Sequence, residues 1–179
     1  MTVWIALLRA VNVAGVNRLP MEEFRALLDE LGLQGAKTYI QSGNAVFCSA
    51  KSAGDLQGLI ADGVLKRFGF RPPVLMRTLA DLEAAHSGCP FKAEAGNRVF
   101  FHFMERDLPR ATGDFLKSLA TADERYAFQG RVLWLHLPGA GAGRSKLADR
   151  VGRLPVDMTV RNLKTVEALI AMAKKLEAI

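Results

Sequence analysis

The sequence predicts an α+β fold, built as a duplication of two ferredoxin-like halves with the element order strand, helix, strand, strand, helix, strand. Three observations favour it. Residues 1–86 alternate strand-like and helix-like segments in that order, residues 97–179 repeat much of it, and a connection rich in glycine, alanine and proline, residues 87–96, joins them. Residue identity between the halves is weak, so the order of elements carries this prediction.

The predicted strands of the first half are short and bounded by turn residues. Val3–Leu8 is an apolar run of strand length. Thr38–Gln41 and Ala45–Phe47 flank Ser42–Gly43, which suits a two-residue hairpin turn because glycine tolerates positive φ. Pro73–Arg77 starts at a proline, which is typical of an edge strand.

The helices of the first half follow from apolar residues at three- and four-residue spacing. Pro20 suits a first helical turn, and Gly32 and Gly69 stand where two helices are expected to end. The expected helices are residues 20–31, residues 52–68 and a short one that starts at Thr78 or Asp81 and ends near His86.

The second half repeats this order in part. The expected elements are a strand at 98–104, a helix at 109–119, a hairpin of 126–128 with 132–137 around Gln129–Gly130, a short helix at 145–151 and a last helix at 162–176. No strand is predicted between the last two helices.

Composition bounds the class of protein. The chain has 179 residues, of which 50% are hydrophobic and 23% charged, as in ordinary globular proteins. A net charge of +6 favours anionic partners, although a solvated basic surface explains it equally well. The basic residues are scattered and form no block, which weakens the case for nucleic acid.

Two isolated cysteines, Cys48 and Cys89, indicate neither a disulfide framework nor a zinc site, and we expect free thiols. The apolar N-terminus lacks a basic segment and is interrupted at Arg9, so it matches neither a signal peptide nor a membrane span. We therefore expect a soluble cytoplasmic protein with no membrane contact, metal or cofactor.

Polar residues follow the first predicted strand, at Arg9 and Asn12. They also precede a predicted helix, where backbone N–H groups favour anions, and an arginine can clamp a phosphate or carboxylate. The structural alternative is that Asn12 forms an Asx turn and Arg9 pairs with an acid.

Two further polar pairs have strong structural alternatives. Ser42 and Asn44 are ordinary hairpin residues. Asn162 is well placed to cap the last helix. Arg161 beside that cap is unfavourable by ~0.3–1 kcal/mol at the positive end of a helix, which a nearby anion would relieve.

The glycine-rich segment Pro138–Lys146 invites comparison with a phosphate-binding loop. The spacing of Walker A and of the dinucleotide motif G-x-G-x-x-G fails at Arg144. A flexible loop is the simpler interpretation, with a looser anion nest at Arg144, Ser145 and Lys146 as the alternative.

The three histidines, His86, His102 and His136, form no recognisable site. His102 and His136 lie within apolar strands, which are neighbours if the second half is ferredoxin-like, and we interpret them as structural residues with satisfied hydrogen bonds. No Ser-His-Asp order and no paired carboxylates are found, so it stays open whether the chain is an enzyme.

Three runs resemble the motifs of a bacterial family of unknown function, DUF1697. They are Leu8–Gly15, similar to Leu-Arg-Gly-Ile-Asn-Val-Gly-Gly; Tyr39–Asn44, unchanged; and Ser145–Lys146 with Thr159–Thr165. The chain departs at Ala10 and Ala14, where glycines are usual, and at Leu163, where an aromatic residue is usual. The resemblance implies an α+β fold and no particular activity.

These observations predict a site for an anionic or phosphate-bearing small molecule. Its candidate residues are Arg9, Asn12, Ser42, Asn44, Ser145, Lys146, Arg161 and Asn162. Arg9 and Arg161 are expected to converge. Ser42 and Asn44 fit less well, because the loop after the first strand and the hairpin are expected at opposite ends of the sheet.

The alternatives are a nucleic-acid-binding module and a protein-interaction module. RNA-binding sheets of this type display aromatic residues on an open face. Here Phe100, Phe101 and Phe103 lie in so apolar a run that we expect them in the core.

Overall fold

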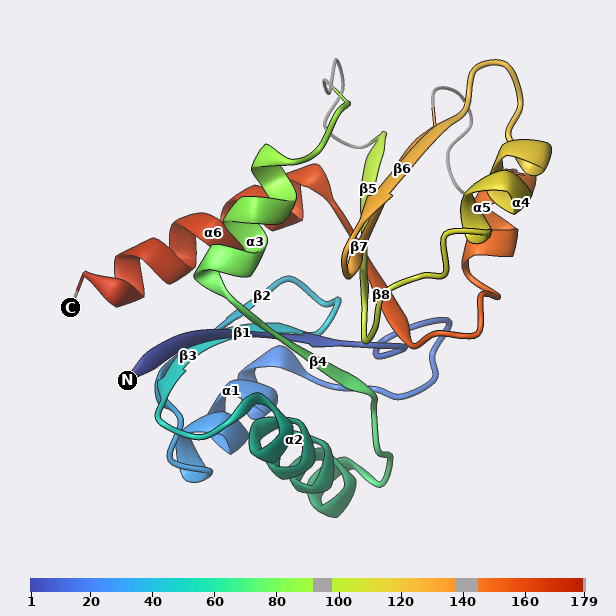
Figure 1. The fold of residues 1–179 in the computed structure, drawn as a ribbon. Coiled ribbons are helices and arrows are strands. Elements are labelled where there is room, and N and C mark those ends of the chain that lie inside the picture. Colours follow the sequence, from blue (N-terminus) through green and yellow to red (C-terminus); the bar gives the residue numbers. More distant parts are fainter. Residues whose placement is uncertain (92–97, 138–144, 179) are drawn as a thin grey trace. The chain divides into compact units, whose positions relative to one another are not determined.

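A computed structural model describes residues 1–91, 98–137 and 145–178 (Figure 1). It contains two four-stranded sheets, with strand orders β2-β3-β1-β4 and β6-β7-β5-β8. The chain divides into two compact units: the first unit is Met1–Glu83 with Ala168–Ile179, and the second unit is Ala84–Glu167. In the described part, no helix combines the length and the apolar character that crossing a bilayer demands.

The first unit has the predicted ferredoxin-like order. Its strand β1 lies between β3 and β4 and runs antiparallel to both, while β2 pairs with β3 at the edge. The elements are β1 (Thr2–Leu8), α1 (Met21–Glu30), β2 (Gln34–Tyr39), β3 (Asn44–Ser49), α2 (Ala53–Phe68), β4 (Val74–Thr78) and α3 (Leu79–Ser87).

Local sequence explains where the long helix of this unit begins and ends. The Ser52 hydroxyl accepts a hydrogen bond from the Asp55 N–H and caps α2, and Gly69 ends it in the left-handed conformation. Helices α1 and α2 cover one face of the sheet (Figure 1). The core on that face includes Leu8, Phe24, Leu28, Phe47, Leu56 and Ile60.

The second unit repeats the same order. Its elements are β5 (Val99–Met104), α4 (Thr112–Leu119), β6 (Arg125–Gln129), β7 (Val132–His136), α5 (Lys146–Val151), β8 (Met158–Asn162) and α6 (Leu163–Glu177). The strand β8 was not predicted, because three of its five residues are polar and give little apolar alternation. With β8 included, the predicted fold class is confirmed, and each βαββαβ set is followed by one more helix.

The repeat extends to the pairing of individual residues. Ile5 on β1 pairs with Arg77 on β4, and Phe101 on β5 pairs with Arg161 on β8. The residues after these arginines cap the next helix in both cases. Thr78 Oγ1 accepts from the Asp81 N–H at 3.2 Å, and Asn162 Oδ1 accepts from the Thr165 N–H at 2.9 Å.

The compact units differ from the expected halves at the two final helices. Residues of α6 from Ala168 onward belong to the first unit, where Leu176 covers Gly35 so closely that an added Cβ would lie 2.8 Å from Leu176 Cδ1. The end of α3 belongs to the second unit, where Trp134 Nε1 donates to the Ala85 carbonyl at 3.1 Å. The division into 1–86 and 97–179 follows chain order and stays a prediction. Residues 92–96 of the expected connection lie outside the described residues.

The predicted two-residue turn at Ser42–Gly43 is wrong in length. Strand β2 ends at Tyr39 and β3 begins at Asn44, so four residues make the turn. Ile40 and Gly43 both have positive φ, at 47° and 73°, which ends the extended backbone earlier than the apolar pattern predicts. Cys48 and Cys89 are free thiols, as predicted.

Candidate functional site

Two segments of the first unit meet at one edge of its sheet: the loop of residues 9–20 after β1, and the turn of residues 40–43. We call them together the loop–turn edge. The Leu8 N–H donates to the Gly43 carbonyl at 2.8 Å, and Asn12 Nδ2 donates to the Gln41 carbonyl at 2.9 Å. The expectation that they lie at opposite ends is therefore wrong. Both β1 and β2 run antiparallel to β3, so both strands end at the same edge.

Asn12 holds this edge together. Its side-chain amide donates to the carbonyls of Leu19 and Gln41, each at 2.9 Å, and its Oδ1 accepts from the Leu19 N–H at 2.8 Å. Its backbone N–H donates to the Asn17 carbonyl at 3.0 Å. These bonds reach well beyond an Asx turn, and they give Asn12 a structural role.

The loop–turn edge contains five residues other than glycine in the left-handed region. They are Ala10, Asn12, Ala14, Asn17 and Ile40, with φ of 55°, 53°, 49°, 54° and 47°. Asparagine tolerates this region, but alanine and β-branched isoleucine do so at a cost of about 1–2 kcal/mol each. Ala10 and Ala14 are the two positions where the motif that this sequence resembles has glycine. The backbone that those glycines suit is thus kept here without them.

Arg9 lies at the start of this edge and is half-buried. Its backbone N–H donates to the Pro73 carbonyl at 2.9 Å, which fixes the end of β1 beside the start of β4. Helix α1 begins only at Met21, so Arg9 and Asn12 do not stand at a helix start as predicted.

Ser42 and Asn44 hold the turn against β1. Asn44 is fully buried, and its Nδ2 donates to the Tyr39 carbonyl at 3.0 Å and to Ser42 Oγ at 2.8 Å. A Cβ on Gly43 would lie 2.6 Å from Val11 Cγ2 and 2.9 Å from Leu8 Cβ. The turn can approach β1 this closely because position 43 has no side chain.

Arg161 is a strand residue, buried on β8, and not a residue of the helix start. Its Nη1 donates to Thr159 Oγ1 and to the Val160 carbonyl, both at 2.7 Å, so the side chain turns back along the strand. Burial lowers the pKa of its guanidinium to about 10. The group stays charged at neutral pH.

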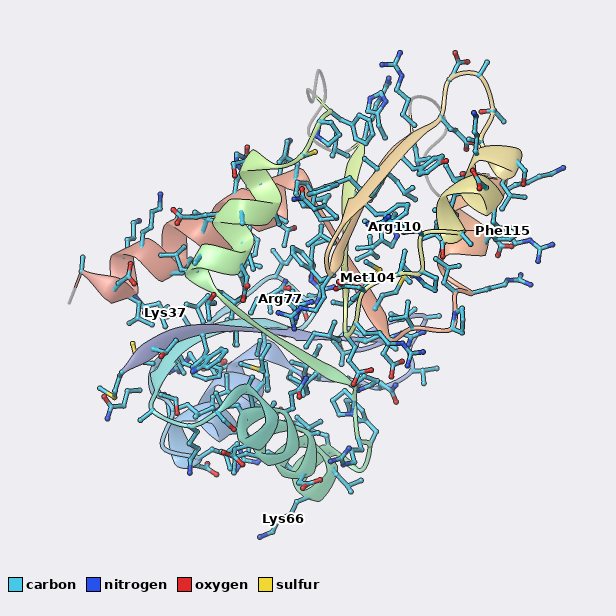
Figure 2. All side chains as sticks on the ribbon, in the orientation of Figure 1. Lys37, Lys66, Arg77, Met104, Arg110 and Phe115 are labelled. Atoms are coloured by element: carbon cyan, nitrogen blue, oxygen red, sulfur yellow. The ribbon has the colours of Figure 1, made fainter. Side chains whose placement is uncertain are left out.

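Arg77, which was not among the predicted site residues, holds the position of Arg161 in the first unit. Arg77 is buried, and its Nη1 donates to the carbonyl of the preceding residue, Met76, at 2.8 Å. Figure 2 shows it on the face of the sheet away from α1 and α2. The signal was in the sequence: an arginine followed by a helix-capping residue occurs at Arg77–Thr78 and again at Arg161–Asn162.

Ser145 and Lys146 begin α5 in the second unit. The Ser145 hydroxyl accepts from the Ala148 N–H at 3.0 Å and caps the helix, while Lys146 is exposed. Burial favours a raised pKa for the Glu124 carboxyl, but hydrogen bonds from Ser145 and Thr121 outweigh it and lower that pKa. Residues 138–144 of the glycine-rich segment lie outside the described residues.

The structure therefore groups the candidate residues by unit. Arg9, Asn12, Ser42 and Asn44 share the loop–turn edge, whereas the other four candidates belong to the second unit. The convergence of Arg9 with Arg161 stays a prediction. Among residues 1–91, 98–137 and 145–178, no three side chains of His, Cys, Asp or Glu are grouped so as to hold a metal ion.

The aromatic run of β5 lies in the interior. Phe101 and Phe103 are fully buried and stack on each other at 6.3 Å between ring centroids, and Phe100 is half-buried. His102 and His136 do lie on neighbouring strands, β5 and β7. The expectation that both are satisfied is wrong for His102, because its buried Nδ1 has no hydrogen-bond partner in the described part of the chain.

Comparison with known proteins supports the family resemblance. The model of the family described as "Protein of unknown function (DUF1697)" matches residues 1–134. A solved structure, that of the conserved bacterial protein SP0830 from Streptococcus pneumoniae, is similar with a TM-score of 0.76 and 26% identity. The similarity covers 96% of this chain and 98% of that one. The comparison with curated proteins gave no match. The chain belongs to the DUF1697 family of proteins of unknown function.

Proposed function

We propose that this protein binds a small anionic molecule, carrying phosphate or carboxylate, at the loop–turn edge of the first unit. One observation carries the proposal. In the described part of the chain, every non-glycine residue with positive φ lies at this edge. The second unit makes the same connection, from β5 to α4 with the turn between β6 and β7, and uses only Gly130 in that conformation.

The fold itself therefore does not require this backbone. Left-handed residues cost free energy and persist only where surrounding bonds hold them, and such residues cluster at binding and active sites. Here the amide of Asn12 supplies those bonds. The loop of the first unit keeps a conformation that costs free energy, although the second unit forms the same connection without it. Ligand binding by the loop is the best explanation.

The chemistry of the edge favours an anion. The sign of φ alternates from Ala10 to Ala14, and alternating backbone of this kind forms concave nests whose N–H groups point toward one spot. The Asn12 N–H is not one of those donors, because it donates to the Asn17 carbonyl within the loop. Arg9 directly precedes this stretch, Arg18 follows it four residues later, and both add positive charge. The net charge of +6 attracts anions over a longer range.

We extend the proposed site to Arg161 in the second unit, with Asn162, Ser145 and Lys146 as softer members, and we place the protein in the cytoplasm. A nucleic-acid-binding module is the rival proposal. The burial of Phe101 and Phe103 speaks against an aromatic RNA-binding face on β5.

The test is calorimetry of inorganic phosphate and pyrophosphate binding. Arg9→Ala removes one charge-assisted contact, so affinity should fall about 10- to 100-fold. If Arg161 shares the ligand, Arg161→Ala should lower affinity too, and the effects in the double variant should not add. Arg25→Ala is the matched control, because Arg25 is an exposed arginine of α1 paired with Asp29.

Circular dichroism should confirm folding of each variant before binding is compared. Equal binding by the parent, Arg9→Ala and Arg25→Ala would defeat the proposal for this edge. Steeply salt-dependent binding of an oligonucleotide, without phosphate or pyrophosphate binding, would favour the nucleic-acid alternative.

A further inference from the structure

His102 lies in the middle of β5, in the core of the second unit. Phe100 and Met104, two residues to either side, face the core that α4 and α5 cover, so His102 shares that face. Its neighbours across the sheet are Leu133 on β7 and Val160 on β8. The side chain is 7% exposed.

The surroundings of His102 offer no counter-charge. The elements that form this core contribute apolar side chains: Leu116 from α4, Leu147 and Val151 from α5, Leu133 and Leu135 from β7, and Met158 from β8. The titratable side chain packed against this described cluster is Tyr126, on β6, and its hydroxyl donates to the Gly113 carbonyl at 2.6 Å. None of the buried residues that the structure describes is a carboxylate, and the buried Arg161 lies next to Val160 on β8 and so on the opposite face of the sheet.

The imidazole is also incompletely hydrogen-bonded. Its Nδ1 is buried and finds no acceptor or donor among the residues that the structure describes. A proton placed on that nitrogen would leave a buried positive charge without an acceptor, which costs several kcal/mol unless the structure opens.

The cover over this core is thin. Helix α5 has 6 residues, whereas its counterpart α2 in the first unit has 16. Val160, the neighbour of His102 on the edge strand β8, is 45% exposed. On this side His102 is therefore next to an edge strand with an exposed side chain.

We propose that His102 makes the second unit acid-labile: protonation of the buried imidazole opens the core beneath α4 and α5 while the core of the first unit stays closed. The equivalent position on β1 is Ala6, which pairs with Met76 as His102 pairs with Val160, and alanine cannot be protonated. The device therefore belongs to one half of the duplication.

The direction of the pH dependence follows from linkage. Burial lowers the pKa of His102 to about 4, and a hydrogen bond with the Leu133 backbone opposes this only in part. An unfolded histidine titrates near 6.5, so the open state takes up a proton first as the pH falls. The stability that the closed second unit gains from keeping His102 neutral is therefore fully present above about pH 6.5. It is lost progressively as the pH falls from there to about 4.

The test is hydrogen exchange of the full chain at about pH 7.5 and about pH 5, corrected for intrinsic rates. Opening of β5, β7 and α5 should increase about 30-fold at the lower pH, while peptides of β1 and β3 should change little. His102→Leu should abolish the increase. His136→Gln, at the half-buried histidine of β7, should keep it.

An increase that persists in His102→Leu, or that is equal in both units, would overturn the proposal. Should His102→Leu fail to fold, an NMR titration of the His102 imidazole in the parent decides. A pKa near or above its ordinary value would also overturn it, because the closed state would then accept the proton without cost.

Discussion

The two units share one strand order but differ in what they add to it. In the first unit, helices of 10 and 16 residues cover a core of apolar side chains, and the edge at the end of β1 carries the left-handed residues. In the second unit the helices have 8 and 6 residues, and a histidine lies on the covered face. The common order shows what the fold requires, and the differences show where each half has specialised.

The two units also differ in the turn between their second and third strands. The Leu8 N–H donates to the Gly43 carbonyl at 2.8 Å, and the Met104 N–H donates to the Arg131 carbonyl at 2.9 Å, so both turns join the end of the first strand of their unit. Only the turn of the first unit is pressed so closely that a side chain would not fit. If this close packing and the loop beside it distinguish the units, substitutions there should change stability more than matched substitutions elsewhere.

The largest effect is expected at Gly43. Gly43→Ala would force a Cβ to within 2.6 Å of Val11 Cγ2 and 2.9 Å of Leu8 Cβ, at a φ of 73°. Overpacking and backbone strain together should lower the free energy of unfolding by about 3 kcal/mol, measured by urea denaturation. Gly130→Ala is the matched control, because φ is 53° but nothing lies within 4 Å. It should cost about 1 kcal/mol, and equal losses would show that packing at Gly43 is unimportant.

Asn12→Ala should come next. It removes the amide that bonds Leu19 and Gln41, and it leaves the backbone N–H of buried Leu19 without its partner. The expected loss is about 2–3 kcal/mol, seen as a lower midpoint in denaturant. Asn17→Ala is the comparison: it removes one bond, from Nδ2 to the Ala10 carbonyl, at another left-handed asparagine. If both variants lose the same amount, Asn12 is not what holds the edge together.

The smallest effect has the opposite sign. Ala14→Gly should stabilise the protein by about 1 kcal/mol, because glycine adopts the observed φ of 49° without strain. Ala111→Gly, in the loop of the second unit at a φ of −59°, should destabilise by about 0.5–1 kcal/mol through backbone entropy. Thermal unfolding of both variants measures the difference, and destabilisation by Ala14→Gly would mean that this residue is not strained.

Much of the fold was predictable because periodicity and capping residues are local. Ser52 and Gly69 mark the limits of α2 in the sequence as they do in the structure. Strand β8 was missed because its pairing with β5, rather than its own composition, makes it a strand. The early end of β2 was not predicted for a similar reason. The positive φ of Ile40 depends on the turn and is not an intrinsic preference of isoleucine.

The candidate site was predictable only as a set of residue types. The sequence singled out Asn12 and Asn44, but their bonds to Leu19, Gln41 and Tyr39 depend on which strand ends share an edge. That edge was misplaced, although the strand order implied it. Arg161 was expected beside the helix start. It is instead part of β8, where the alternation of side chains puts it on the same face as Thr159, to which it donates a hydrogen bond.

The assignment of α6 has a consequence for how the chain is made. Residues from Ala168 onward complete the first unit, although Glu83 is the last residue of that unit's longer segment. During synthesis the first sheet emerges early, yet Leu176 reaches its place over Gly35 only after the whole second unit has been translated. Until the second unit has been synthesised, the first unit therefore lacks the residues of α6 that belong to it. Helix α6 completes the first unit, and a ribosome stalled before α6 would expose an incomplete first unit to chaperones and proteases.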